Sequence, residues 1–88
     1  MTKHICHPGV YIRVYMEERG MAQKQLTHDL DINPAITSLL LNEKRDINPK
    51  MALKLQKVFG VPAINWLIWQ ANYDLFKEMR KQNDNSKE

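Results

Sequence analysis

The stretch from Gln23 to Asn42 constrains the fold of this 88-residue chain more than any other stretch. Both of its halves carry side chains spaced to lie on one face of a short helix: Leu26 and Leu30, then Thr37, Leu40 and Leu41. Between the halves stands Asp31, a residue type that tolerates the left-handed conformation of a turn. Asn33 and Pro34 are typical of a helix cap and of the first helical position. The stretch is therefore predicted to form a helix-turn-helix.

Caps and apolar spacing predict three more helices, at about residues 8–19, 49–59 and 63–80. Together with the helix-turn-helix, they predict a single all-α domain of five helices, of which the last is long. Residues 1–7 are expected to form a flexible leader. Residues 82–88 are all polar, and we expect them to form a frayed tail.

The composition narrows the classes of protein that this chain can represent. A chain of 88 residues buries one small core, and no apolar run approaches the length that spans a bilayer. The N-terminal residues are too few and too polar for a signal peptide, and the single Cys6 cannot close an intrachain disulfide. We therefore expect a cytoplasmic protein with no membrane partner. The net charge of +3 is compatible with a polyanionic partner but does not establish one.

Neither a metal site nor a catalytic site is predicted. His4, Cys6, His7 and His28 lack the paired spacing of a tetrahedral metal site. His28 and the adjacent Asp29 point in different directions from one helix, and no pair of nucleophile and base is evident. We expect no enzymatic activity, no cofactor and no small-molecule substrate.

The last predicted helix carries more apolar surface than one small domain can bury. Its apolar residues form two stripes: Ile64, Ile68, Ala71, Leu75 and Met79, beside Trp66, Trp69, Tyr73 and Phe76. A second copy of the chain is the simplest cover, so we predict a homodimer and place the four aromatic residues in its interface. The alternative is a tryptophan-rich core with some exposed aromatic surface.

The first predicted helix also has surplus apolar surface. Val10 and Val14 lie beside the inward stripe of Ile12 and Met16. They are candidates for a surface that binds a protein partner, and the alternative is a larger core.

The outward face of the second motif helix is the candidate for reading DNA bases, because this helix of a helix-turn-helix lies in the major groove. That face carries Ala35, Ser38 and Leu39, which offer a methyl, a hydroxyl and an isobutyl group. This face can therefore form few specific hydrogen bonds to bases. We expect apolar contacts to thymine methyl groups, and so a DNA site that contains A·T pairs.

Phosphate contacts are predicted to supply most of the DNA affinity. The candidate residues lie at the start of the first motif helix and around the end of the second: Gln23, Lys24, Asn42, Lys44 and Arg45. A dimer would place two such surfaces on half-sites roughly 34–36 Å apart on double-stranded DNA.

Several short motifs, in order along nearly the whole chain, resemble those of the HigA antitoxins, also called VapI, which belong to the Xre/Cro-like helix-turn-helix group. The matching segments are His7-Pro8-Gly9, Glu18-Arg19-Gly20-Met21, Gln23-Lys24-Gln25-Leu26, Leu40-Leu41-Asn42, Lys44-Arg45, Met51-Ala52-Leu53, Gly60, Trp66-Leu67 and Gln70-Ala71-Asn72-Tyr73-Asp74-Leu75. The resemblance implies a lambda-repressor-like fold and a homodimeric antitoxin that binds operator DNA and represses its own operon. It also implies a toxin partner similar to HigB, a RelE-like ribonuclease that cuts ribosome-bound mRNA.

The chain departs from the family pattern at five positions. Ala22 stands where Ser is usual, and Asp31 where Gly is usual. Thr37 replaces Ile or Val, so its buried hydroxyl needs a hydrogen bond, for which the carbonyls of its own helix are candidates. Leu39 replaces a common Arg, and Glu43 replaces Gly and adds a negative charge near the expected phosphates.

Two other functions remain open. The chain could be a stand-alone Xre-type repressor with no toxin. It could also be a protein-binding module that has lost DNA readout, for which Leu39 and Glu43 are the supporting residues.

Overall fold

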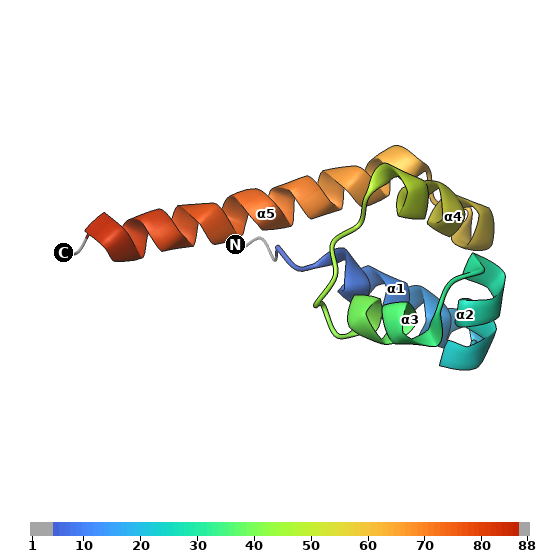
Figure 1. The fold of residues 1–88 in the computed structure, drawn as a ribbon. Coiled ribbons are helices and arrows are strands. Elements are labelled where there is room, and N and C mark those ends of the chain that lie inside the picture. Colours follow the sequence, from blue (N-terminus) through green and yellow to red (C-terminus); the bar gives the residue numbers. More distant parts are fainter. Residues whose placement is uncertain (1–4, 87–88) are drawn as a thin grey trace.

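The computed structural model describes residues 5–86, which form five helices connected by short loops (Figure 1). The helices are α1 (Pro8–Arg19), α2 (Gln23–Leu30), α3 (Pro34–Leu41), α4 (Pro49–Phe59) and α5 (Ala63–Ser86). No strand occurs within these residues. The predicted five-helix architecture is confirmed.

The helix boundaries follow from local chemistry. Asn33 and Asn48 cap α3 and α4, because their side-chain oxygens accept hydrogen bonds from the N–H groups of Ala35 and Met51 at 2.7 and 2.8 Å. Asp31, at the turn between α2 and α3, has a φ of 55°, the left-handed conformation that the sequence predicts there. The helix-turn-helix is therefore formed as expected.

The core lies among α1, α2, α3 and α4, and the first turns of α5 close it. Its fully or almost fully buried apolar residues include Ile12, Leu26, Leu30, Leu40, Ala52, Leu55 and Trp66. The C-terminal half of α5 projects beyond the other helices (Figure 1), which gives the molecule dimensions of 47 × 28 × 22 Å.

His7 corrects the expectation of a flexible leader. Its side chain is 1% exposed, its Nδ1 atom accepts a hydrogen bond from the Gly9 N–H at 2.9 Å, and its ring packs edge-on against Tyr73 with centroids 5.2 Å apart. His7 therefore caps α1 and ties it to α5. Of the rest of the predicted leader, residues 1–4 lie outside the described residues.

Gly9 is required where α1 crosses the end of α3. A Cβ atom at this position would clash with the carbonyl oxygen of Leu40. The two helices approach this closely only because Gly9 has no side chain.

The last helix is longer than predicted. It continues from the expected end at Arg80 through Ser86, so residues 82–86 of the predicted frayed tail are helical, and residues 87–88 lie outside the described residues. Extending an existing helix costs little compared with starting one, and this segment contains neither Gly nor Pro to stop it.

Candidate nucleic-acid interface

The helices α2 and α3 are locked together through a pair of threonines. Thr37 is fully buried, and its hydroxyl is hydrogen bonded to the hydroxyl of Thr27 at 2.7 Å. The Thr27 hydroxyl also donates to the carbonyl of Gln23 at 2.9 Å. The expected bond from Thr37 to its own helix is thus replaced by a bond between the two helices of the motif.

The helix α4 holds the turn of the motif from the other side. The Lys54 ammonium donates a hydrogen bond to the carbonyl of Leu30 at 2.9 Å and lies 3.5 Å from the carbonyl of Asp31. A cation at the C-terminus of α2 satisfies carbonyls that have no partner within the helix. The angle between α2 and α3 is therefore fixed by contacts on both sides.

The three candidate base-contact residues share the outward face of α3. Ala35 and Leu39 are exposed and Ser38 is partly buried, whereas the opposite face of the helix is in the core. Leu39 is 40% exposed, so its isobutyl group is accessible from outside the helix. The structure thus brings Ala35, Ser38 and Leu39 together on an accessible surface, and their contact with bases stays a prediction.

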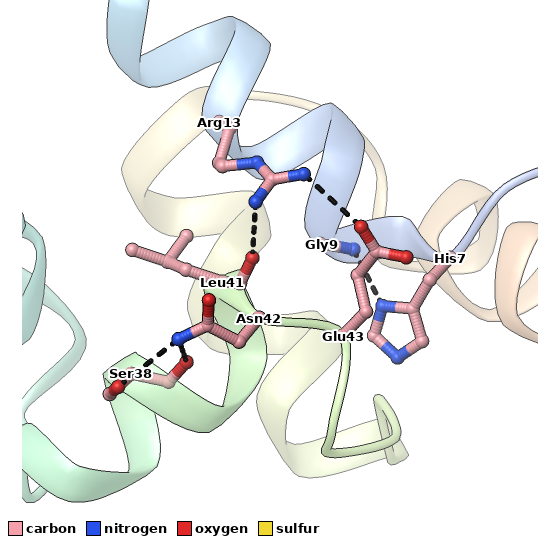
Figure 2. Close-up of polar contacts among 7 residues, drawn as sticks. All are labelled: His7, Gly9, Arg13, Ser38, Leu41, Asn42 and Glu43. Carbon is pink, nitrogen blue, oxygen red and sulfur yellow. Dashed lines mark hydrogen bonds and ion pairs between the residues drawn. The ribbon is translucent and has the colours of Figure 1, made fainter.

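Asn42 folds back onto the helix that it follows. Its amide nitrogen donates to the carbonyl of Ser38 at 2.8 Å and lies 3.3 Å from the Ser38 hydroxyl oxygen (Figure 2). These bonds hold the exposed Asn42 side chain at the edge of the base-contact face. A phosphate contact from Asn42 stays a prediction, and it would use the remaining capacity of the amide group.

The candidate phosphate-binding residues lie at both ends of the motif. Gln23 and Lys24 are exposed in the first turn of α2, where unpaired backbone N–H groups and the helix dipole also favour an anion. Lys44 and Arg45 are exposed in the loop between α3 and α4. Among the side chains of residues 5–82, those of Lys24, Lys44 and Arg45 form no ion pair or hydrogen bond.

Sequence reasoning missed Arg13, which reaches the motif from α1. Its Nη1 atom donates to the carbonyl of Leu41 at 2.8 Å, and its Nη2 atom lies 3.1 Å from a carboxylate oxygen of Glu43 (Figure 2). Glu43 has a φ of 62°, a conformation that most residue types avoid. An acidic residue at a position where the family has Gly was the available signal that a cationic partner lies nearby.

The buried His7 imidazole lies beside the same loop. Burial is the largest influence on its pKa and lowers it from the ordinary value of 6.5, and the charge of Lys77 acts in the same direction. The Arg45 backbone and the Glu43 and Asp46 carboxylates act in the opposite direction. The Nδ1 atom accepts the Gly9 N–H and therefore carries no proton, so the neutral ring is the form that fits this site. Among the side chains of residues 5–82, the Nε2 atom of His7 has no hydrogen-bond partner.

The predicted dimer interface is wrong at Trp66. This side chain is fully buried within the chain, and its Nε1 atom donates to the carbonyl of Val61 at 3.2 Å. Trp69 and Tyr73 are partly covered as well. Trp69 stacks on Tyr11 with ring centroids 4.2 Å apart, and Tyr73 contacts His7. The aromatic stripe packs mainly against α1 and α4, as the alternative of a tryptophan-rich core has it. Phe76, further along α5, is partly buried with the Arg80 guanidinium over its ring.

The exposed surface of α5 is the other apolar stripe. Its large side chains have exposed fractions between 48% and 60%: Ile64, Ile68, Leu75 and Met79. On α1, Val14 is 46% exposed and Val10 is partly buried. Of the two candidates for a partner surface on α1, Val14 is the more accessible.

The described part of the chain shows neither a membrane-spanning helix nor a metal site. None of its helices combines the length and apolar character needed to cross a membrane. The side chains described for residues 5–82 contain no group of three able to hold a metal ion.

No protein-family model matches the chain, but several curated proteins are similar to it. It is 35% identical to virulence-associated protein I of Dichelobacter nodosus over 81 residues, which is 90% of this chain and 75% of the relative. It is 37% identical to virulence-associated protein A of the same organism, over 78% of this chain and 70% of the relative. The uncharacterised HTH-type transcriptional regulator YddM of Escherichia coli is 31% identical, over 77% of this chain and 72% of the relative.

Solved structures share the whole architecture. A HigA-family addiction module antidote protein from Coxiella burnetii is 28% identical and has a TM-score of 0.82, over 94% of this chain and 91% of that one. The Pseudomonas aeruginosa antitoxin HigA with the higBA promoter is 23% identical and has a TM-score of 0.86, over 93% of this chain and 90% of that one, which shows a shared fold. The names of these relatives and structures are those of virulence-associated proteins, a transcriptional regulator and antitoxins. The chain belongs to the HigA/VapI family of Xre-type helix-turn-helix proteins.

Proposed function

We propose that this chain is an antitoxin that binds its own operator DNA as a repressor. The observation that carries the proposal is the accessible face of Ala35, Ser38 and Leu39 on α3, with exposed cations at the start of α2 and just after α3. This is the arrangement in which a helix enters the major groove while both of its flanks contact phosphates. The Pseudomonas aeruginosa HigA structure, which has the same fold, was solved with the higBA promoter.

The proposed readout is mainly apolar. Ala35 and Leu39 present methyl groups, and the Ser38 hydroxyl is close to the Asn42 amide. Such a face favours contacts with thymine methyl groups over bidentate hydrogen bonds to guanine. Lys24, Lys44 and Arg45 would then supply an affinity that falls steeply with salt and depends little on sequence.

The proposed active form is a homodimer formed through the exposed stripe of α5, which replaces the aromatic stripe that the sequence suggested. Ile64, Ile68 and Leu75 recur at helical spacing along the helix and leave an apolar surface that water covers in the single chain. A second copy that packs along this stripe would bury both surfaces at once and present two α3 helices to DNA.

The proposed protein partner is a toxin similar to HigB. The candidate docking surface is Val14 on α1, with Val10 beside it, because Val14 is 46% exposed and belongs to a different helix from the proposed dimer stripe. Under this proposal the antitoxin neutralises the toxin by direct binding.

Co-expression with the neighbouring small reading frame tests the proposal. The expected result is that the chain rescues growth, co-purifies with the product of that frame and shifts the promoter DNA upstream of the pair. A promoter shift without rescue or co-purification would instead identify a stand-alone repressor. Co-purification without any salt-sensitive DNA binding would identify a protein-binding module.

A further inference from the structure

Arg13 lies on α1, outside the helix-turn-helix, but its guanidinium contacts both the end of α3 and the loop that follows it. One nitrogen donates to the Leu41 carbonyl at 2.8 Å, and another lies 3.1 Å from the Glu43 carboxylate (Figure 2). The last carbonyls of a helix lack partners within the helix and carry partial negative charge. Arg13 therefore anchors the C-terminus of α3, the helix that carries the base-contact face.

Glu43 is followed directly by two cations. Lys44 and Arg45 are exposed, and they are the proposed phosphate contacts of the loop between α3 and α4. A free carboxylate in this loop would pair with these cations or repel the phosphates of DNA. In the structure the Glu43 carboxylate instead points toward α1 and lies between Arg13 and His7 (Figure 2).

The ion pair contributes little to folding. The side chains of Arg13 and Glu43 are 49% and 36% exposed, and solvent screens an interaction of this kind. The main consequence of the pair is therefore the direction in which it holds the carboxylate.

We propose that Arg13 is a positioning residue for DNA binding, because it anchors the end of α3 and holds the Glu43 carboxylate away from Lys44 and Arg45. This inference rests on the proposed DNA binding. If the two charges acted independently, their effects on DNA affinity would simply add. Under this proposal they do not add, because removal of Arg13 releases the carboxylate to pair with the loop cations. The charge of Glu43 then matters strongly only when Arg13 is absent.

The experiment compares the wild-type chain with Arg13→Met, Glu43→Gln and the double variant. Affinity is measured by fluorescence anisotropy on a labelled duplex from the upstream promoter region and on a scrambled duplex of the same composition. Glu18→Gln is the control for Glu43→Gln, because both variants remove one negative charge. Glu18 is exposed and lies about 140° around α1 from Arg13. Met keeps the length of the side chain and removes both contacts.

Arg13→Met is expected to weaken binding to both duplexes by about tenfold, since it frees a charge among the phosphate contacts. Glu43→Gln alone should match Glu18→Gln to within about twofold. In the Arg13→Met background, Glu43→Gln should recover at least about fivefold in affinity. The coupling between the two positions is the signature of the proposal.

Equal effects of Glu43→Gln in both backgrounds would show that the two charges act independently and would overturn the inference. Thermal unfolding of each variant identifies any loss of fold. If Arg13→Met does not fold, Arg13→Lys takes its place, because Lys keeps the charge but cannot bridge two acceptors in a fixed fork. Arg13→Lys should then lower DNA affinity less than Arg13→Met would, and Glu43→Gln should restore that affinity. Equal effects of Glu43→Gln in the wild-type and Arg13→Lys chains would again contradict the proposal. Absence of binding by the wild-type chain would contradict the proposed function itself, before any variant is compared.

Discussion

The hydroxyl oxygens of Thr27 and Thr37 lie 2.7 Å apart and join the two helices of the motif at a point where Thr37 is fully buried. Thr27 has a second bond, to the Gln23 carbonyl, whereas Thr37 depends on Thr27. The two residues are therefore not equivalent. Removing the Thr27 hydroxyl and removing the Thr37 hydroxyl are therefore expected to lower the free energy of unfolding by different amounts.

Thr27→Val is expected to destabilise the fold by about 1–3 kcal/mol, because it leaves the buried Thr37 hydroxyl without a partner. Thr37→Val should cost less than about 1 kcal/mol, since the Thr27 hydroxyl keeps the Gln23 carbonyl. Urea unfolding of the two variants and of the double variant checks the order. A Thr27→Val variant no less stable than Thr37→Val would indicate that the Thr37 hydroxyl turns to the carbonyls of its own helix.

Gln70 is expected to be the most important polar residue of α5 for stability. It is 5% exposed, and its side-chain oxygen accepts a hydrogen bond from the backbone N–H of the buried Ile47 at 2.7 Å. Gln70→Leu leaves that N–H unpaired in the interior and should cost about 1–3 kcal/mol. Gln56→Leu is the control, because Gln56 accepts from the Ala63 N–H in an exposed setting where water can replace it. Equal costs for the two variants in urea unfolding would contradict this account.

The buried His7 is expected to make stability depend on pH. Its folded-state pKa lies below the ordinary value of 6.5, so the unfolded chain binds more protons between the two values, and stability rises with pH there. The contribution is complete above 6.5 and is lost as the pH falls through that value. The free energy of unfolding should therefore fall more steeply on acidification for the wild type than for His7→Asn, whose side-chain oxygen can still cap α1. Parallel pH profiles for the two chains would show that His7 titrates alike in both states.

The stripe of Ile64, Ile68, Leu75 and Met79 is expected to control the oligomeric state. Ile68→Glu should shift the chain from dimer to monomer in sedimentation equilibrium, because it places a charge in the proposed apolar interface. Lys77→Glu introduces the same group about half a turn around α5 and should leave the dimer intact. A wild-type monomer, or a dimer that survives Ile68→Glu, would exclude this stripe as the interface.

The features that were predictable from sequence are those with local causes. Asn33 and Pro34 specify the start of α3 through chemistry within one turn, and Asp31 specifies the turn before it. The apolar spacing of the motif likewise identifies which face of α3 is buried and which is accessible. The candidate base-contact face could be predicted for this reason.

The features that were missed depend on contacts between distant segments. His7 is buried because Tyr73 packs against it from α5, and no local sequence pattern predicts such a contact. The last helix carries two apolar stripes of similar strength, and only its packing on α1 and α4 decides that Trp66 faces inward. In the sequence Arg13 has no feature that distinguishes it from other surface residues, because its partner Glu43 is brought near it only by the fold.

We propose that the outward face of α3 and its flanking cations bind operator DNA. The most direct measurement is a fluorescence anisotropy titration of the wild-type chain and of Lys44→Gln/Arg45→Gln with promoter and scrambled duplexes over a range of salt concentrations. We expect the wild type to prefer the promoter duplex. The double variant should weaken binding to both duplexes alike and lower the salt slope by about 1 for each lost contact. A wild type without salt-dependent binding, or a double variant that keeps full affinity at moderate salt, would contradict the account.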